Sequence, residues 1–321
     1  MDTDLQRRQL LAGLTAMMSG TAWAQDGRSV RFVLPNAVSS GVDTITRSAQ
    51  SALARALGLP VVVENQPGAG GVVGVQTLAR AAPDGFTLGV VSNNVVIFPS
   101  VIRSLPFDLN TDVVPIAICG YTPVVLVVNP RVPAKDSKEF VAFLKGKGGE
   151  ANYASGGNGT ILHLASAMYL DEAGVTARHI PYKGVGPMLT DLIGGQVDFA
   201  TAALPSVQAH LKTGALRAVG VATAQRVAAA PEIPTFVEQG LPGYVVEAWF
   251  AVLGPRGLPA AEVARINAAV VAAFADPGVK EAMARQGNVI QISTPEFAQK
   301  FFRDELVKYA RLVKKAGVEA Q

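Results

Sequence analysis

Short apolar runs rich in β-branched residues alternate along this chain with Ala-rich segments of helical period. In the N-terminal part, apolar runs bounded by turn residues predict strands at 30–34, 61–64, 87–91, 114–118 and 124–128. The first two gaps between these strands hold helical patterns, at 44–57 and 72–81. This β-α-β-α-β order predicts a parallel sheet covered by helices.

The same alternation starts again after residue 150. Apolar runs predict strands at 152–154, 178–181, 197–201 and 216–223, separated by helical patterns at 161–173, 187–193 and 205–213. The chain closes with a strand at 247–255 and helices at 260–275 and 295–316. Asp276-Pro277 and Ser293-Thr294-Pro295 are helix-start signals.

Two α/β units, with a C-terminal part that returns to the first, predict a chain that crosses twice between two lobes. The strands expected to cross, 124–128 and 249–253, are both apolar, and both end in Pro-containing segments. We therefore assign residues 25–123 and 250–321 to lobe 1 and residues 124–249 to lobe 2. A ligand is expected in the cleft between the lobes, facing the C-terminal ends of the strands.

The first residues have the pattern of an export signal. Arg7-Arg8 precede an apolar run at 10–18, and Ala22-Trp23-Ala24 has the spacing of a cleavage site. The apolar run is far shorter than the roughly 20 residues needed to span a bilayer. We expect residues 1–24 to be a signal peptide cleaved after Ala24, and the mature protein to be free in the periplasm. The paired arginines also resemble a twin-arginine signal, so the export route stays open.

Composition narrows the class of protein. Hydrophobic residues make up 49% of the chain and charged residues only 17%, which is typical of a folded protein. The net charge is +3, Lys and Arg are scattered and only two Trp are present, whereas nucleic-acid binding calls for a basic stripe with exposed aromatic residues. The single Cys119 cannot form an intramolecular disulfide, and we expect it to pack as a small apolar residue.

Motifs for catalysis, cofactors and metals are missing from the sequence. In "GAGGVVG" (68–74) the third glycine of a dinucleotide loop is replaced by Val73, and "SGGNGT" (155–160) lacks the lysine of a P-loop. No Gly-x-Ser-x-Gly elbow occurs, and the three histidines have no metal-ligand spacing. For His163 we favour a packing role, and for Asp43 and Arg47 a surface ion pair. We therefore expect neither an enzyme nor a bound cofactor or metal.

Three loops of one kind remain. Segments 35–43, 68–74 and 155–160 each join a predicted strand to a predicted helix through small residues. Such loops expose backbone N–H groups at the positive end of a helix, which suits a carboxylate or phosphate. One such loop can be merely a tight turn, but three on the same edge, split between two lobes, favour an anion site.

Several blocks resemble the signature blocks of the Bug receptors, the periplasmic solute-binding proteins of tripartite tricarboxylate transporters. They include "PNAVSSGVDTITR", "LGLPVVVENQPGAGGVVG", "PDGFTL", "YASGGNGTILHLA", "HIPYKGVGPMLTDLIGGQVDFA", "PEIPTFVEQGLPG" and "WFAVLGPRGLP". The resemblance extends in register over nearly all of the mature chain. It implies a type II periplasmic-binding-protein fold, in which two α/β lobes joined by two crossing strands close around a small organic acid.

The resemblance also implies a set of ligand-binding residues. In such receptors the carboxylate is held mainly by backbone amides and small polar side chains of the strand-to-helix loops. Carried over position by position, these are Asn36, Ala37, Val38, Ser39, Ser40, Asp43, Ala69, Gly70, Ser92, Asn93, Ser155, Gly156, Gly157, Asn158, Gly159, Thr160 and Tyr182.

The chain departs from the family pattern in two places. Asn36 stands where an aromatic residue is usual, and Ser39-Ser40 replace a Gly-Gly pair, which predicts a smaller or more polar ligand or a shifted pose. Family members that bind amino-dicarboxylates can present an acid near 202–203, but "DFATAALPS" has none beyond Asp198. We therefore expect a carboxylate ligand without a positive amine.

Three functions compete on this sequence. The preferred one is a monomeric receptor that delivers an organic acid to membrane permease subunits. A signalling receptor that docks on a sensor kinase has the same sequence features. A periplasmic enzyme on this scaffold would need a strongly perturbed titratable group in the cleft, and the sequence offers no candidate.

Overall fold

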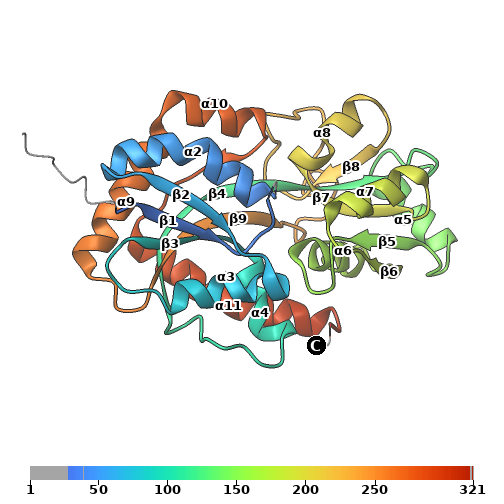
Figure 1. Cartoon of the computed structure of the whole chain (residues 1–321). Helices are drawn as coiled ribbons and strands as arrows, with labels where there is room; N and C mark the ends of the chain where they lie inside the picture. The colour runs from blue at the N-terminus through green and yellow to red at the C-terminus, as the bar shows by residue number, and fades with distance from the viewer. Residues whose placement is uncertain (1–27, 39, 319, 321) are drawn as a thin grey trace, which may run out of the picture.

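The computed structural model describes residues 28–38, 40–318 and 320, and it has the expected two α/β lobes (Figure 1). The predicted signal peptide 1–24 and Ser39 lie outside the described residues. No helix among the described residues is long and apolar enough to cross a membrane.

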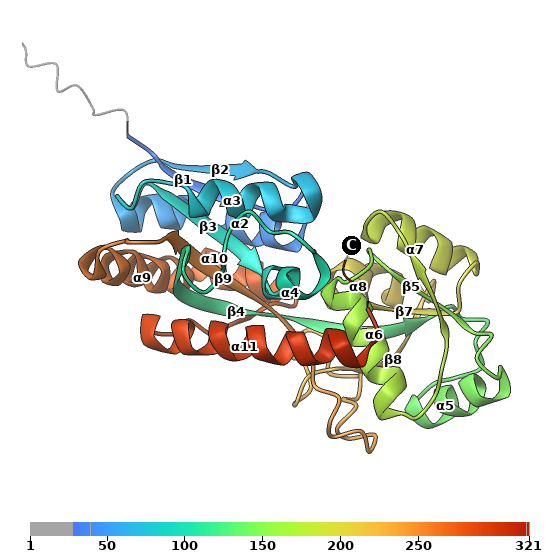
Figure 2. The ribbon, with the colours of Figure 1, turned by 90° about the horizontal axis from the view of Figure 1, so that it is seen from below.

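The first lobe is built on a mixed sheet in the order β2-β1-β3-β9-β4, in which β4 is Val113–Val128. Strand β1 (Val30–Leu34) pairs in parallel with β2 (Val61–Asn65) and β3 (Thr87–Ser92), whereas β9 (Glu247–Pro255) runs antiparallel to β3 and to β4. Covering this sheet are the helices α2 (Gly41–Leu57), α3 (Val72–Ala79), α4 (Asn94–Val101), α9 (Ala260–Ala275), α10 (Pro277–Arg285) and α11 (Pro295–Lys315). Figure 2 shows α11 running along β4.

The second lobe has its own sheet and core. Strand β4 pairs antiparallel with β7 (Phe199–Ala203) and β8 (Arg217–Val221), while β5 (Asn152–Ser155) pairs in parallel with β7 and with β6 (Arg178–Pro181). The helices of this lobe are α5 (Ser137–Gly146), α6 (Ile161–Glu172), α7 (Val185–Gly194) and α8 (Leu204–Lys212). Both sheets thus carry helices on their faces, as the sequence pattern predicts.

One strand corrects the sequence prediction. The runs at 114–118 and 124–128 form a single strand, β4 (Val113–Val128), which belongs to both sheets. Gly120 has a φ of 146°, and the register with β9 shifts twice before it, between Pro115 and Ala117 and between Ile118 and Gly120. The chain returns through Val246, whose N–H donates to the carbonyl oxygen of Ala222, and enters β9. The lobe limits 25–123, 124–249 and 250–321 remain our proposal.

Several elements are absent from the sequence prediction. They are α4, α5, α10, the short strand β10 (Val289–Ile290) and the 3₁₀ turn Gly68–Gly71. Helix α10 begins at the expected start signal, because the Asp276 side chain accepts from the N–H groups of Gly278 and Val279. Cys119 is 1% exposed in the core, and burial raises the pKa of its thiol to about 12, so the predicted packing role is confirmed.

Candidate functional site

Ser40 shapes the first loop, between β1 and α2. It is the N-cap of α2, and its Oγ accepts from the N–H of Asp43 at 3.3 Å. The neighbouring Ala37 and Val38 are exposed, with Val38 at 65%. This loop therefore presents Ser40 and the start of a 17-residue helix at one edge of the sheet.

Asp43 is not part of a surface ion pair. Its side chain is only 3% exposed, while that of Arg47 is 44% exposed. The Asp43 Oδ1 accepts from Arg47 Nε at 2.9 Å and from Asn65 Nδ2 at 3.0 Å. Asn65 Nδ2 also donates to the carbonyl oxygen of Asn36 at 3.1 Å, so Asn65, which sequence reasoning missed, fastens the loop to β2 and α2. Among the described residues, none forms a hydrogen bond with the enclosed Oδ1 of half-buried Asn36.

The glycines of the second loop allow close packing. Gly70 and exposed Ala69 lie in the 3₁₀ turn, with Ala69 at a positive φ of 50°. A Cβ on Gly71 would lie 2.8 Å from the carbonyl oxygen of Pro35, and a Cβ on Gly74 would lie 2.8 Å from the Cα of Pro35. The loops 35–43 and 68–74 are thus brought together, and glycine is required where they touch.

Ser92 and Asn93 at the end of β3 occupy different environments. Ser92 is half-buried, whereas Asn93 is 0% exposed. Asn93 Nδ2 donates to the carbonyl oxygen of Glu247 at 3.1 Å and to Tyr309 Oη at 3.0 Å. Its Oδ1 has no hydrogen-bond partner within the part of the chain that the structure describes. The Asn93 side chain therefore points toward β9 and α11, away from solvent.

In the second lobe, side chains of the 155–160 loop form hydrogen bonds with the backbone of the same loop. Thr160 caps α6, accepting from the N–H of His163 at 3.3 Å and donating to the carbonyl oxygen of Gly157 at 2.9 Å. The buried Ser155 Oγ accepts from the N–H of Gly157 at 3.2 Å and lies 2.7 Å from His179 Nε2. The backbone between them, Gly156, Gly157 and Asn158, is left half-buried or exposed.

His163 and His179 form a stack behind this loop. Their ring centroids lie 3.8 Å apart with an interplanar angle of 6°. His163 Nδ1 accepts from the N–H of Gly159 at 3.1 Å. Burial, and to a smaller extent the neighbouring His179, lowers the pKa of His163 to about 4. Burial also lowers the pKa of His179. His163 is 5% exposed and acts as a neutral packing residue, as predicted.

Tyr182 lies against the same loop. Its N–H donates to the carbonyl oxygen of Ser155 at 3.0 Å, and its hydroxyl donates to Asp191 Oδ2 at 2.8 Å. Burial and the Asp191 carboxylate raise the pKa of this phenol to about 12, so it stays a neutral hydrogen-bonding group. Tyr182 and the 155–160 loop therefore form one surface.

Helix α4, which the sequence did not predict, contacts the loops of both lobes. Asn94 Oδ1 accepts from the N–H of Ile161, at the start of α6, at 3.0 Å. A Cβ on buried Gly159 would lie 2.9 Å from Val101 Cγ1, and a Cβ on Gly71 would lie 3.2 Å from the ring of Phe98. The second-lobe loop thus contacts both ends of this short helix, at Asn94 and Val101, and the first-lobe loop contacts Phe98 between them.

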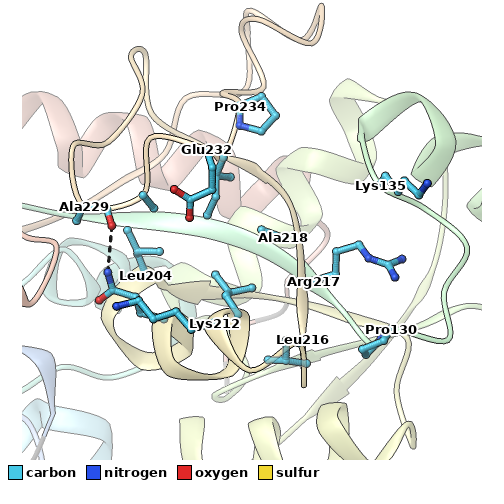
Figure 3. Close-up of a pocket in the computed structure, with 15 residues that line it drawn as sticks. Pro130, Lys135, Leu204, Lys212, Leu216, Arg217, Ala218, Ala229, Glu232 and Pro234 are labelled. Carbon is cyan, nitrogen blue, oxygen red and sulfur yellow. Dashed lines mark hydrogen bonds between the residues drawn. The ribbon is translucent and has the colours of Figure 1, made fainter.

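A cavity of about 450 Å³ lies elsewhere, beside α8 and β8 (Figure 3). It is lined by none of the predicted ligand-binding residues. Its Arg217 is engaged with the carbonyl oxygens of Val132 and Ala134, each at 3.2 Å, and Glu232 brings a carboxylate into the same lining. Lys135 and Lys212 line the cavity as well, so its charge does not decide against an anion. The candidate site stays with the loops because none of the described residues predicted to bind the ligand lines this cavity.

The chemistry of the loops is that of recognition. Ser40 and Thr160 cap helices of 17 and 12 residues, whose N-termini favour negative charge. Within the described part of the chain, no group of three or more His, Cys, Asp or Glu side chains is placed to hold a metal ion. The arrangement can bind a small anion between two lobes.

These features define a two-lobed α/β protein with anion-compatible loops on both lobes, and comparison with known proteins gives its family. Residues 45–318 match the family described as "Tripartite tricarboxylate transporter family receptor". The chain is 33% identical to Protein BugT of Bordetella pertussis over 96% of this chain and 94% of BugT. This chain therefore belongs to the tripartite tricarboxylate transporter receptor family, the Bug receptors.

Solved structures agree with this assignment. The periplasmic binding protein BugD superposes with a TM-score of 0.80 at 31% identity, over 92% of this chain and 99% of BugD. MatC from Rhodopseudomonas palustris, a structure with bound malate, superposes with a TM-score of 0.78 at 30% identity, over 89% of this chain and 99% of MatC. The type II two-lobed fold is thereby confirmed.

Proposed function

We propose that this receptor captures a small organic acid between its lobes and delivers it to the permease of a tripartite tricarboxylate transporter. The observation that carries the proposal is the placement of two capped helix N-termini, at Ser40 and Thr160, in loops from the two lobes. The malate in MatC supports a carboxylate as the ligand class. Because both lobes contribute donors, closure adds contacts that an open form lacks.

The donors are adequate for micromolar binding. A charge-assisted hydrogen bond contributes about 1.5–3 kcal/mol. Four or five such bonds reach the roughly −8 kcal/mol of a micromolar complex once the costs of association are subtracted. The donors we propose are the backbone N–H groups of 36–39, Gly156 and Asn158, together with the Ser40 hydroxyl. The N–H groups of Ser40 and Gly157 already donate within their own loops.

The ligand in this proposal has no ammonium group. The residues at 202–203, Ala202 and Ala203, carry no charge, and Ala202 is 0% exposed. The nearby Asp198 is already engaged, since its Oδ2 accepts from the N–H of Asn152 at 2.8 Å. An ammonium would therefore lose hydration at this wall without gaining a partner.

The remaining parts of the proposal concern location and partners. The family is periplasmic, and we propose that the chain reaches the periplasm after cleavage behind Ala24. We further propose that it acts as a monomer, without catalysis and without a cofactor, and that its partners are permease subunits.

Thermal unfolding of refolded residues 25–321 against mono-, di- and tricarboxylates tests the proposal. Refolding is needed because a receptor can carry its ligand through purification. At a hundred times its dissociation constant, a true ligand stabilises the fold by about 2.7 kcal/mol, which shifts the melting temperature by several degrees. A panel without any shift would contradict a carboxylate ligand.

A further inference from the structure

A cavity of about 570 Å³ lies at the crossing strands β4 and β9, next to Asn93, whose side chain donates to the carbonyl oxygen of Glu247. Its walls come from β4 near Gly120, the first residues of β9, the segment 291–294 and the start of α11. We call it the crossing-strand cavity. A volume of this size is within the range of small-molecule sites, about 300–1,000 Å³. None of the predicted carboxylate-binding residues lines it.

Aromatic rings form much of its wall. Tyr121, Trp249, Phe297 and Phe301 all line the cavity. The Phe301 ring packs edge-on against the Trp249 ring, with the ring centroids 5.8 Å apart, and stacks with the Phe297 ring at a centroid distance of 5.7 Å. Phe297 is 54% exposed, so an aromatic ring stands open to solvent at the rim. Aromatic faces attract cations, most strongly where water is excluded.

One carboxylate supplies the only formal charge of the lining among the described residues. Glu247 is half-buried there, and its side chain makes no hydrogen bond or ion pair within the described part of the chain. The nearest cation, Lys308, is paired with Glu305 at 2.9 Å. Glu305 also accepts from Trp249 Nε1 at 2.7 Å, so its carboxylate is bonded both to Lys308 and to the indole.

We infer that the crossing-strand cavity binds a small organic cation, such as a quaternary ammonium, with its charge against the Glu247 carboxylate and its alkyl groups against the aromatic rings. A half-buried carboxylate without a partner gains most from a cation that sheds water readily. An inorganic cation suits the wall less well, because it would leave the rings without apolar contact. An anion is disfavoured by Glu247 itself.

The groups around Glu247 predict how pH acts on this site. Burial and Glu305 raise the pKa of Glu247, while Lys308 lowers it, and Tyr121 faces the same cavity with its own pKa raised by burial and by Glu247. Cation binding needs the ionised Glu247. Affinity should therefore increase with pH through the titration of this carboxyl and then level off.

The test uses choline and its uncharged isostere 3,3-dimethylbutan-1-ol as probes. Trp249 is the only tryptophan of residues 25–321, so its fluorescence reports on this wall, and calorimetry gives the affinity. We expect choline to bind at least about tenfold more tightly than the isostere. Glu247→Gln should remove that preference, and Phe297→Ala, at an exposed ring, should weaken choline binding without unfolding the chain.

Glu296→Gln is the matched control for the change of charge. Glu296 is exposed on α11, next to Phe297, and does not line the cavity. It should bind choline as the wild type does. Equal binding of choline and the isostere, no choline binding, or full choline binding by Glu247→Gln would each overturn the inference. The outcome is separate from the proposed function, because carboxylate binding is measured without choline.

Discussion

Ser40 caps a helix, and in our proposal the same side chain also binds the ligand. Its Oγ caps α2, and no hydrogen bond among the described residues uses its hydroxyl proton, which can be donated to a ligand oxygen. Where the family pattern has glycine, this chain therefore adds a donor at the positive end of a helix. Two substitutions separate the roles.

Ser40→Asp should keep the cap and lose the ligand. Asp is as good an N-cap as Ser, so the melting temperature should stay near that of the wild type. The added negative charge should weaken carboxylate binding at least about tenfold by calorimetry. Ser40→Ala, as the control, should cost about 1 kcal/mol of stability and reduce affinity less. Unchanged carboxylate binding by Ser40→Asp would rule out this loop as the anion site.

We expect the protein to lose stability in acid because His163 is buried in its neutral form. Its pKa is lowered from 6.5 to about 4 in the fold, so the unfolded chain binds more protons between these values. The stability that neutral His163 contributes is thus fully present above pH 6.5 and is lost as the pH falls toward 4, at up to about 1.4 kcal/mol per pH unit. Urea unfolding at several pH values measures the slope.

His163→Asn is the control for that slope. Its Oδ1 can accept from the N–H of Gly159 in place of the ring Nδ1, but it does not titrate. The stability of this variant should fall less steeply between pH 6.5 and 4. An identical slope would mean that other groups, and not His163, set the acid limit.

At the scale of elements, β4 depends on one glycine. A Cβ on Gly120 would collide with the carbonyl oxygen of Val289 in β10, and its φ of 146° is unfavourable for other residues. Gly120→Ala should therefore destabilise the protein by more than about 2 kcal/mol in denaturant unfolding. Gly146→Ala, in α5 with open space around its Cβ, should be neutral or slightly stabilising. Equal stability of both variants would contradict this geometry.

We expect one substitution in α4, Asn94→Ala, to lower the affinity for the ligand and to leave the fold intact. Asn94→Ala removes the acceptor for the N–H of Ile161, which joins the two lobes. A hydrogen bond of this kind contributes about 1 kcal/mol, so ligand affinity should fall about fivefold while the ligand-free melting temperature changes little. A loss of stability without a loss of affinity would show that this contact serves the fold alone.

The same elements show which parts of the structure the sequence could predict. Segments with a clear period were found, with β9 and α9 assigned at their observed bounds. Helix α4 was missed because "NVVIFPSV" contains Pro99 and buries Val95, Val96, Ile97 and Phe98 in succession, so it has no amphipathic period. Its bond to Ile161 joins residues 67 positions apart, which no local pattern reveals.

For the site, loop positions could be predicted but side-chain directions could not. Ser92 ends β3, whereas Asn93 already has helical backbone angles as the N-cap of α4, and its side chain packs inward. Asp43 was expected on the surface, because its partner Asn65 comes from a distant strand. Which of the predicted loop residues touch a ligand remains a prediction.

At the scale of the molecule, two sheets share β4, and the chain returns between them before β9. This architecture lets the lobes move about two connections while each keeps its own core. We propose that the helix N-termini capped by Ser40 and Thr160 then meet a ligand from opposite lobes. In this proposal, the lobes close as the carboxylate is bound, so closure and recognition are a single event.

Isothermal titration of refolded residues 25–321 with succinate, malate and adipate, and with aspartate as the amino analogue, tests the central claim most directly. We predict one bound ligand per chain for at least one of these acids, with a dissociation constant near the micromolar range. Aspartate should bind at least about tenfold more weakly than the best acid, because an ammonium finds no partner at 202–203. Tightest binding of aspartate, or no binding of any of the acids, would contradict the account.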